Sequence, residues 1–228
     1  MINVNKPQHF DIKPDAPQAI KDAVESGKIP KKQAYEAGFA DIRCNAMQTK
    51  FMQCQHYNSN MEQILLNLDM VLSNSGVSID ALCGSAKDVC SEQEIKALVH
   101  WHQNPKGLIY YGEVSHVYKR MEAMTAALVR NFIDARIYTV NDMVEQFLEG
   151  DLQGQVIVVP DFFTKVCENK THDPFMRHKT NAYSFLIKMR QQGQRAIVYT
   201  HDIGLFSERH GGQLLHDLLK EQFYPVEV

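Results

Sequence analysis

The chain has 228 residues, of which 44% are hydrophobic and 22% are charged, and its formal net charge is −3. Such a composition is typical of a globular protein with a sizeable core. It excludes wholesale disorder and the coating of nucleic acid by bulk charge. No apolar run approaches the roughly 18 residues of a membrane span, and the polar N-terminus lacks a signal-peptide core. We therefore expect a cytoplasmic protein with no membrane partner.

The N-terminal part, residues 1–85, is predicted to be a helical region that binds a partner. Residues 1 to about 16 are polar and proline-bearing, which is typical of a loose arm. Apolar spacing then predicts three helices, within residues 18–28, 31–55 and 61–72. Four methionines in this part either fill a small core, which we favour, or form an adaptable partner surface. They are Met47, Met52, Met61 and Met70.

Two capping boxes predict helix N-termini. One is Ser59-x-x-Glu62, and the other is Ser91-x-x-Glu94. The second opens a helix that Asn104-Pro105 should end. Between these boxes the amphipathic helical pattern gives way to a short mixed stretch. We therefore place the domain boundary between about 76 and 90 and the second domain at 90–228.

Five cysteines are present, an odd number with no C-x-x-C pair. Thiolates and imidazole suit zinc, but the candidate ligands lack the close pairs of a zinc motif. Those candidates are Cys44, Cys54, His56, Cys83 and Cys90. We favour buried reduced thiols and predict no metal site.

Short apolar runs alternate with helical patterns in the C-terminal half. The predicted strands are 107–111, 135–140, 155–159, 195–200 and 223–228, and helices are predicted between them. Such alternation predicts an α/β fold of three layers, with a parallel sheet between helices and a ligand crevice at the carboxyl ends of the strands.

The first of these strands leads into a loop that opens on Gly112. A strand, a glycine loop and a helix form the layout of a phosphate-binding loop, whose chemistry requires G-x-x-x-x-G-K-[ST]. Counted from Gly112, Val117 replaces the second glycine, Tyr118 the lysine and Lys119 the hydroxyl. The sequence therefore predicts a nucleotide-binding scaffold with weakened nucleotide chemistry. A one-residue slip that makes Lys119 the phosphate lysine is the alternative.

The ends of the later strands carry few of the acids that phosphoryl transfer needs. After the third strand comes Pro160-Asp161, which offers one carboxylate for Mg²⁺ or for orienting water. Asp202 follows the fourth strand, where a polar side chain would sense the γ-phosphate. With these groups altered, fast hydrolysis of ATP is not expected.

The segments GLIYYG, RIYTVNDMVEQFLEG, GQVIVVPDF and FLIKMRQQGQRAIVYTHD follow one another in the order of the DnaC/IstB family, which this chain resembles over roughly residues 95–228. The resemblance implies an AAA+ core without a large lid, a replicative helicase hexamer as partner, and a possible homo-oligomer. It places Gly112 and Ser115 in the phosphate loop, with Tyr118 replacing the ATP-binding lysine. It also aligns Asp217-Leu218-Leu219 with a family segment that carries an arginine finger, which is missing here.

Several basic side chains could follow a single DNA strand, although a solvated surface explains them equally well. The candidates are Lys119, Arg120, Arg136, Arg177 and Lys179. Stacking aromatics would be needed as well, and of the available ones Tyr110 and Phe162 are more typical of a core.

Three functions remain open. The leading hypothesis is a replication accessory protein, similar to a helicase loader, with no catalytic residue and no required cofactor. It binds a helicase, and single-stranded DNA is its second candidate partner. Its degenerate ATP chemistry suggests a phage or mobile element. The second hypothesis is a slow ATPase that uses ATP and Mg²⁺ through Lys119 and Asp161. The third is an inert regulator or inhibitor of a host AAA+ assembly.

Overall fold

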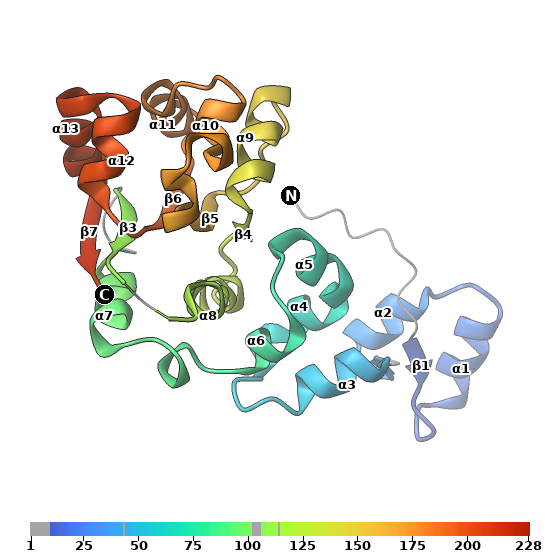
Figure 1. The fold of residues 1–228 in the computed structure, drawn as a ribbon. Coiled ribbons are helices and arrows are strands. Elements are labelled where there is room, and N and C mark those ends of the chain that lie inside the picture. The colour runs from blue at the N-terminus through green and yellow to red at the C-terminus, as the bar shows by residue number, and fades with distance from the viewer. Residues whose placement is uncertain (1–9, 43, 102–105, 114) are drawn as a thin grey trace. The chain divides into compact units, whose positions relative to one another are not determined.

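The computed structural model describes residues 10–42, 44–101, 106–113 and 115–228 (Figure 1). The chain divides into two compact units, Met1–Val71 and Leu72–Val228. Most of the predicted N-terminal arm, the predicted helix end at Asn104-Pro105, and Val114 of the predicted phosphate loop lie outside the described residues.

The first unit is helical but contains a small sheet that the sequence did not predict. Strands β1 (Phe10–Ile12) and β2 (Ala40–Ile42) pair in antiparallel fashion. Part of the predicted arm is therefore a strand, because Phe10 is buried against Ala34 and Ala40. The helices of this unit are α1 (Gln18–Glu25), α2 (Lys31–Glu36), α3 (Ala46–Met52), the 3₁₀ turn η1 (Ser59–Met61) and α4 (Glu62–Leu66).

The predicted long helix over 31–55 is wrong. Helix α2 ends at Glu36, and Gly38 adopts a φ of 81°, which favours glycine and turns the chain into β2. The capping box at Ser59 is also absent from the described structure, because Glu62 instead accepts a hydrogen bond from the Tyr35 hydroxyl at 2.7 Å. The predicted helix over 61–72 is interrupted at Asn67, after which α5 (Leu68–Ser75) begins.

The boundary between the units falls at Val71/Leu72 rather than between 76 and 90. Helix α6 (Ile79–Cys83) packs on α8 (Val117–Arg130) within the second unit. The Arg130 guanidinium also donates to the carbonyls of Leu82 and Gly84 at 2.7 and 3.0 Å. These contacts bind residues 79–84 to the core that follows them.

The second unit is built on five parallel strands in the order β4-β5-β6-β3-β7. They are β3 (Gly107–Tyr111), β4 (Ala135–Ile137), β5 (Val156–Phe163), β6 (Arg195–Thr200) and β7 (Phe223–Glu227). The bounds of β3 and β6 agree with the prediction, because both are short apolar runs bounded by polar or turn residues. The predicted α/β fold, with a parallel sheet between helices, is confirmed.

Helices cover both faces of this sheet (Figure 1). Helices α7 (Glu92–Trp101) and α8 pack on one face. The other face carries α9 (Val140–Glu149), α10 (Pro174–Arg177), α11 (Ala182–Gln191), α12 (Ile203–His210) and α13 (Gly212–Gln222). The 3₁₀ turns are η2 (Ala86–Asp88), η3 (Lys165–Glu168) and η4 (Lys170–His172).

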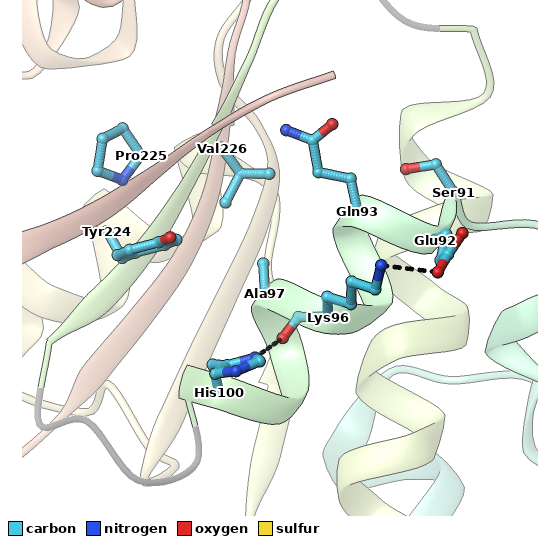
Figure 2. Close-up of a pocket in the computed structure, with 9 residues that line it drawn as sticks. All are labelled: Ser91, Glu92, Gln93, Lys96, Ala97, His100, Tyr224, Pro225 and Val226. Carbon is cyan, nitrogen blue, oxygen red and sulfur yellow. Dashed lines mark hydrogen bonds and ion pairs between the residues drawn. The ribbon is translucent and has the colours of Figure 1, made fainter.

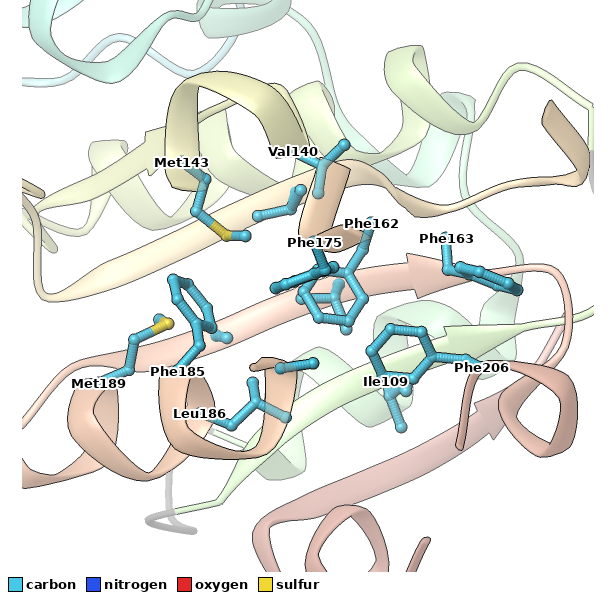
Figure 3. Packing of buried hydrophobic residues seen from close by; sticks show 14 of the residues in the cluster. Ile109, Val140, Met143, Phe162, Phe163, Phe175, Phe185, Leu186, Met189 and Phe206 are labelled. Atoms are coloured by element: carbon cyan, nitrogen blue, oxygen red, sulfur yellow. The ribbon is translucent and has the colours of Figure 1, made fainter. Parts of the chain in front are cut away.

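The core under α9–α13 is rich in aromatic side chains (Figure 3). Phe162, Phe175 and Phe206 form a continuous set of ring contacts, with centroids 5.1 to 6.0 Å apart. Alternation along the strands explains why this face is filled, since Ile157 and Val159 of β5 point into it together with Val198 of β6.

Strand β5 is longer than predicted and irregular near its end. Its pairing with β6 is regular as far as Val159, shifts register, and resumes at Phe163 opposite Thr200. Pro160 lies within the irregular stretch, as expected of a residue that has no N–H to donate to a ladder. The carboxyl edge at this point is therefore formed by Phe163 rather than by Val159.

Strand β7 is the last strand of the sheet. The Val228 N–H donates to the Tyr111 carbonyl of β3 at 3.0 Å. Because N–H groups alternate along a strand, the Pro225 nitrogen faces the other edge. Because proline has no N–H to donate, it weakens the pairing of this edge with a strand of another chain.

Candidate functional site

The loop after β3 lies at the carboxyl edge of the sheet, where a ligand crevice was predicted. Gly112 adopts a φ of 124°, which favours glycine. Its carbonyl accepts a hydrogen bond from the Tyr199 hydroxyl of β6 at 2.5 Å. A Cβ built on Gly112 would lie 2.5 Å from the Val228 carbonyl oxygen. The glycine is therefore needed where the backbone that follows β7 approaches the loop.

Helix α8 begins at Val117, the position of the second glycine in a phosphate loop. No side chain among the described residues caps this N-terminus, and its flanking residue His116 adopts a φ of 58°. Ser115 and Lys119 are exposed, and Tyr118 is 53% exposed. Partial burial raises the pKa of the Tyr118 phenol, and the Glu122 and Asp161 carboxylates contribute to the rise.

Asp161, predicted to follow the third strand, lies within the irregular end of β5 and forms a structural contact. Its Oδ1 accepts the backbone N–H of Val140, the first residue of α9, at 2.9 Å. Burial raises the pKa of the Asp161 carboxyl above its usual value. This carboxylate supports the N-terminus of α9 together with Thr139, whose hydroxyl accepts the Asp142 N–H at 3.2 Å.

Asp202, the candidate at the sensor position, is the N-cap of α12. Its Oδ1 accepts the Leu205 N–H at 2.9 Å, and its own N–H and carbonyl lie within hydrogen-bonding distance of the Thr200 hydroxyl. The arrangement fixes the turn between β6 and α12. Both acids singled out at this edge therefore bind backbone N–H groups of helix N-termini.

The chemistry that this edge offers is limited. Within the described parts of the chain, no group of three histidine, cysteine, aspartate or glutamate side chains converges as metal ligands would. The cysteines are free thiols, and burial raises the pKa of Cys44 and raises that of Cys90 to about 12. Neither thiol is poised as a nucleophile, because the thiolate is the reactive form.

A buried charged cluster near the end of β5 was not found from the sequence. Asp173 has 0% exposure, and its Oδ2 lies 2.8 Å from His210 Nε2 and 3.7 Å from Arg209 Nη1. Arg209 also donates to the carbonyls of Cys167 and Glu168. The one available signal was Asp173-Pro174, a cap followed by proline at the first helical position.

Two further side-chain contacts involve the segment after β5. His201 Nε2 lies 2.8 Å from Glu168 Oε1, and the imidazole stacks on Phe163 with centroids 5.4 Å apart. Lys165 pairs with Glu113 of the loop after β3. The acids of the segment after β5 are thus engaged with protein side chains.

Most of the candidate DNA-binding residues are engaged in intramolecular contacts. Arg120 pairs with the buried Glu94 at 2.5 Å, and Glu94 also completes the predicted capping box by accepting the Ser91 N–H. Arg136 pairs with Asp134 at 3.0 Å, and Arg177 donates to the Asn141 side chain at 2.8 Å. Lys119 and Lys179 are exposed, and in the described part of the chain no ion pair involves either.

A groove runs between α7 and β7 (Figure 2). It is lined by Ser91, Glu92, Gln93, Lys96, Ala97, His100, Tyr224, Pro225 and Val226. The pairing of Lys96 with Glu92 at 2.7 Å leaves its walls mixed in charge. Tyr224, which is 52% exposed, is its largest aromatic side chain.

No protein-family model matches the sequence, and no curated protein matches it. The fold is similar to that of three solved structures. They are the replication initiator DnaA bound to AMPPCP and single-stranded DNA (11% identity, TM-score 0.43), a DNA replication initiation factor (9%, 0.43) and AMPPCP-bound DnaA from Aquifex aeolicus (11%, 0.41). Each comparison covers 63% of this chain and 49% of the other, so this chain spans about half the length of the structures it matches.

These values describe a partial likeness of fold and carry no information on activity. None of the described helices is long and apolar enough to cross a bilayer.

Proposed function

We propose that this chain is a DNA-replication accessory protein, similar to a helicase loader, that acts by binding and not by hydrolysing ATP. The observation that supports it most is the use of both Asp161 and Asp202 as acceptors for helix N-termini. A phosphoryl-transfer site needs such carboxylates free for Mg²⁺ and water. Tyr118, in place of the phosphate lysine, supplies no positive charge for a polyphosphate and supports the same proposal.

Thermal unfolding of the native protein with and without ATP and Mg²⁺ tests the nucleotide part of the proposal. A ligand at 100 times its dissociation constant stabilises a fold by about 2.7 kcal/mol. We expect no shift of the melting temperature at millimolar ATP. A clear shift would instead favour the slow ATPase, with Lys119 as the phosphate-binding group.

We propose that the first unit binds the helicase. Met47 and Met52 of α3 are 41% and 46% exposed, whereas Met61 is buried. Exposed methionines suit an adaptable contact with a replicative helicase. We expect the double variant Met47→Lys, Met52→Lys to lose co-purification with the helicase. The matched control Leu148→Lys, at a 56% exposed position on α9, should keep it.

The effect of the full chain on helicase unwinding separates two roles of the same complex. A rise would support a loader, and a fall would support the inert regulator or inhibitor. Equal binding by the methionine variant and the native chain would contradict docking through α3.

Single-stranded DNA is the second proposed partner, contacted by Lys119 and Lys179. Phosphate contacts make binding salt-dependent, and each lost contact lowers the slope of log K against log salt by about 1. We expect Lys119→Ala and Lys179→Ala to lower that slope in fluorescence anisotropy. Arg136→Ala should not, because Arg136 is paired with Asp134.

A further inference from the structure

The loop after β3 is fixed from two sides by its own chain. On one side, the Tyr199 hydroxyl donates to the Gly112 carbonyl at 2.5 Å. On the other side, the Val228 N–H donates to the Tyr111 carbonyl, in the last pair of the β3–β7 ladder, Tyr111 with Glu227. The Gly112 backbone is thus held between β6 and the residue that follows β7.

The approach of Val228 is close. Its carbonyl oxygen would lie 2.5 Å from a Cβ on Gly112, a distance that real Cβ atoms essentially never show. A carbonyl oxygen carries partial negative charge, so it opposes an anion in the same place. The glycine that a phosphate-loop pattern assigns to ligand binding is therefore required here by the chain's own backbone.

The hollow between the start of α8 and the residue after β7 is small and partly open to solvent. A cavity of about 10 Å³ is bounded by Val117 and Met121 of α8, by Tyr199 and by Val228, with the Glu94–Arg120 pair at its other side. A space of this size holds about one water molecule. A phosphate group, with its four oxygens, is larger than this hollow.

We propose that the contact of Val228 with Tyr111 and Gly112 is a closure, which excludes polyphosphate from the loop after β3 whatever residue stands at position 118. This inference rests on the proposed function, since it gives a physical reason why the chain does not use ATP. It differs from the loss of the lysine, because restoring a lysine would not reopen the loop. Displacing Val228 would be needed as well.

Four full-length proteins test the closure by binding of ATP with Mg²⁺, measured by thermal shift and with a fluorescent nucleotide. They are the native chain, Tyr118→Lys, and Tyr118→Lys combined with either Val228→Pro or Val228→Ala. Proline removes the N–H that donates to Tyr111, whereas alanine keeps it and serves as the matched control. We expect Tyr118→Lys with Val228→Pro to bind at least about tenfold more tightly than Tyr118→Lys alone, and the alanine control to resemble Tyr118→Lys.

Equal binding by Tyr118→Lys with and without Val228→Pro would overturn the closure, and so would the absence of binding by a folded Val228→Pro double variant. Hydrogen exchange gives a second readout that needs no ligand. The Val228 amide should be protected in the native chain and in Tyr118→Lys, and Gly112→Ala should remove that protection. Rapid exchange of the native amide would also overturn the closure. Binding of ATP by the native chain would instead contradict the proposed function.

Discussion

Two segments leave the same carboxyl edge of the sheet and are held in different ways. The loop after β3 is held by backbone groups, by the Tyr199 phenol and by the exposed pair of Glu113 with Lys165, and its Ser115 side chain is exposed. The segment after β5 is held by charged side chains that turn inward, with Asp173 fully buried against Arg209 and His210. At the same edge of the sheet, backbone contacts therefore fix the loop after β3, whereas buried polar side chains fix the segment after β5.

The polar groups expected in a ligand crevice are present at this edge, but they bind other parts of the protein. Asp161 and Asp202 accept N–H groups at helix N-termini, and the other acids described above contact basic or histidine side chains. A carboxylate that accepts a backbone N–H at a helix start is favourably placed and not free for metal binding. The predictions below test how firmly each segment is held.

The largest effect is expected at Asp173, in the segment after β5. Asp173→Ala removes the partner of His210 and Arg209 and the acceptor of the Met176 N–H. Leaving buried charged groups unpaired costs about 3 to 5 kcal/mol. Urea unfolding should show a loss of this size.

Two variants control this measurement. Asp173→Asn keeps an acceptor for the cap and should cost less than alanine. Asp217→Ala removes an exposed carboxylate that accepts only from Gln213 in the described contacts, and it should stay within about 0.5 kcal/mol of the native protein. Similar losses for Asp173→Ala and Asp217→Ala would show that the segment after β5 is not fastened by its buried acid.

A somewhat smaller effect is expected beside the loop after β3. Glu94 is 2% exposed, pairs with Arg120 at 2.5 Å and accepts the Ser91 N–H. Glu94→Ala should cost about 3 kcal/mol, because Arg120 keeps a partly buried charge without its partner. The double variant Glu94→Leu, Arg120→Met should recover part of that loss in the same urea assay. A double variant less stable than Glu94→Ala would contradict this account.

The sheet was predictable because its strands are nearly continuous apolar runs. Strands β3 and β6 are covered on both faces of the sheet, and their central residues Leu108, Ile109, Ile197 and Val198 are all buried. Strand β1 escaped prediction because its three residues, with Phe10 and Ile12 on either side of Asp11, are too few to establish an alternating pattern. The extension of β5 escaped because Pro160 ordinarily ends a strand, and here it lies in an irregular stretch that the register shift accommodates.

The sequence directed attention to the loop after β3 but not to the contacts made there. Val117 and Tyr118, the motif positions counted from Gly112, lie at the start of α8. The contacts that occupy the site join residues far apart in the chain, such as Asp161 with Val140 and Gly112 with Val228. Local periodicity carries no information on such pairs, because they depend on how the strands are ordered in the sheet.

The smallest predicted effect concerns Asp161 and depends on pH. Burial raises the folded-state pKa of this carboxyl above its usual 3.8, so the folded protein holds the proton more tightly than the unfolded chain. The resulting stabilisation is complete below the usual pKa and is lost as pH rises through the raised one. Asp161→Asn keeps an oxygen for the Val140 N–H but does not ionise. Its free energy of unfolding, relative to the native protein, should therefore improve between about pH 4 and pH 7. If urea midpoints of variant and native protein change in parallel over this range, Asp161 is not desolvated at the start of α9. Asp161 would then not differ in access to water from the exposed side chains of the loop after β3.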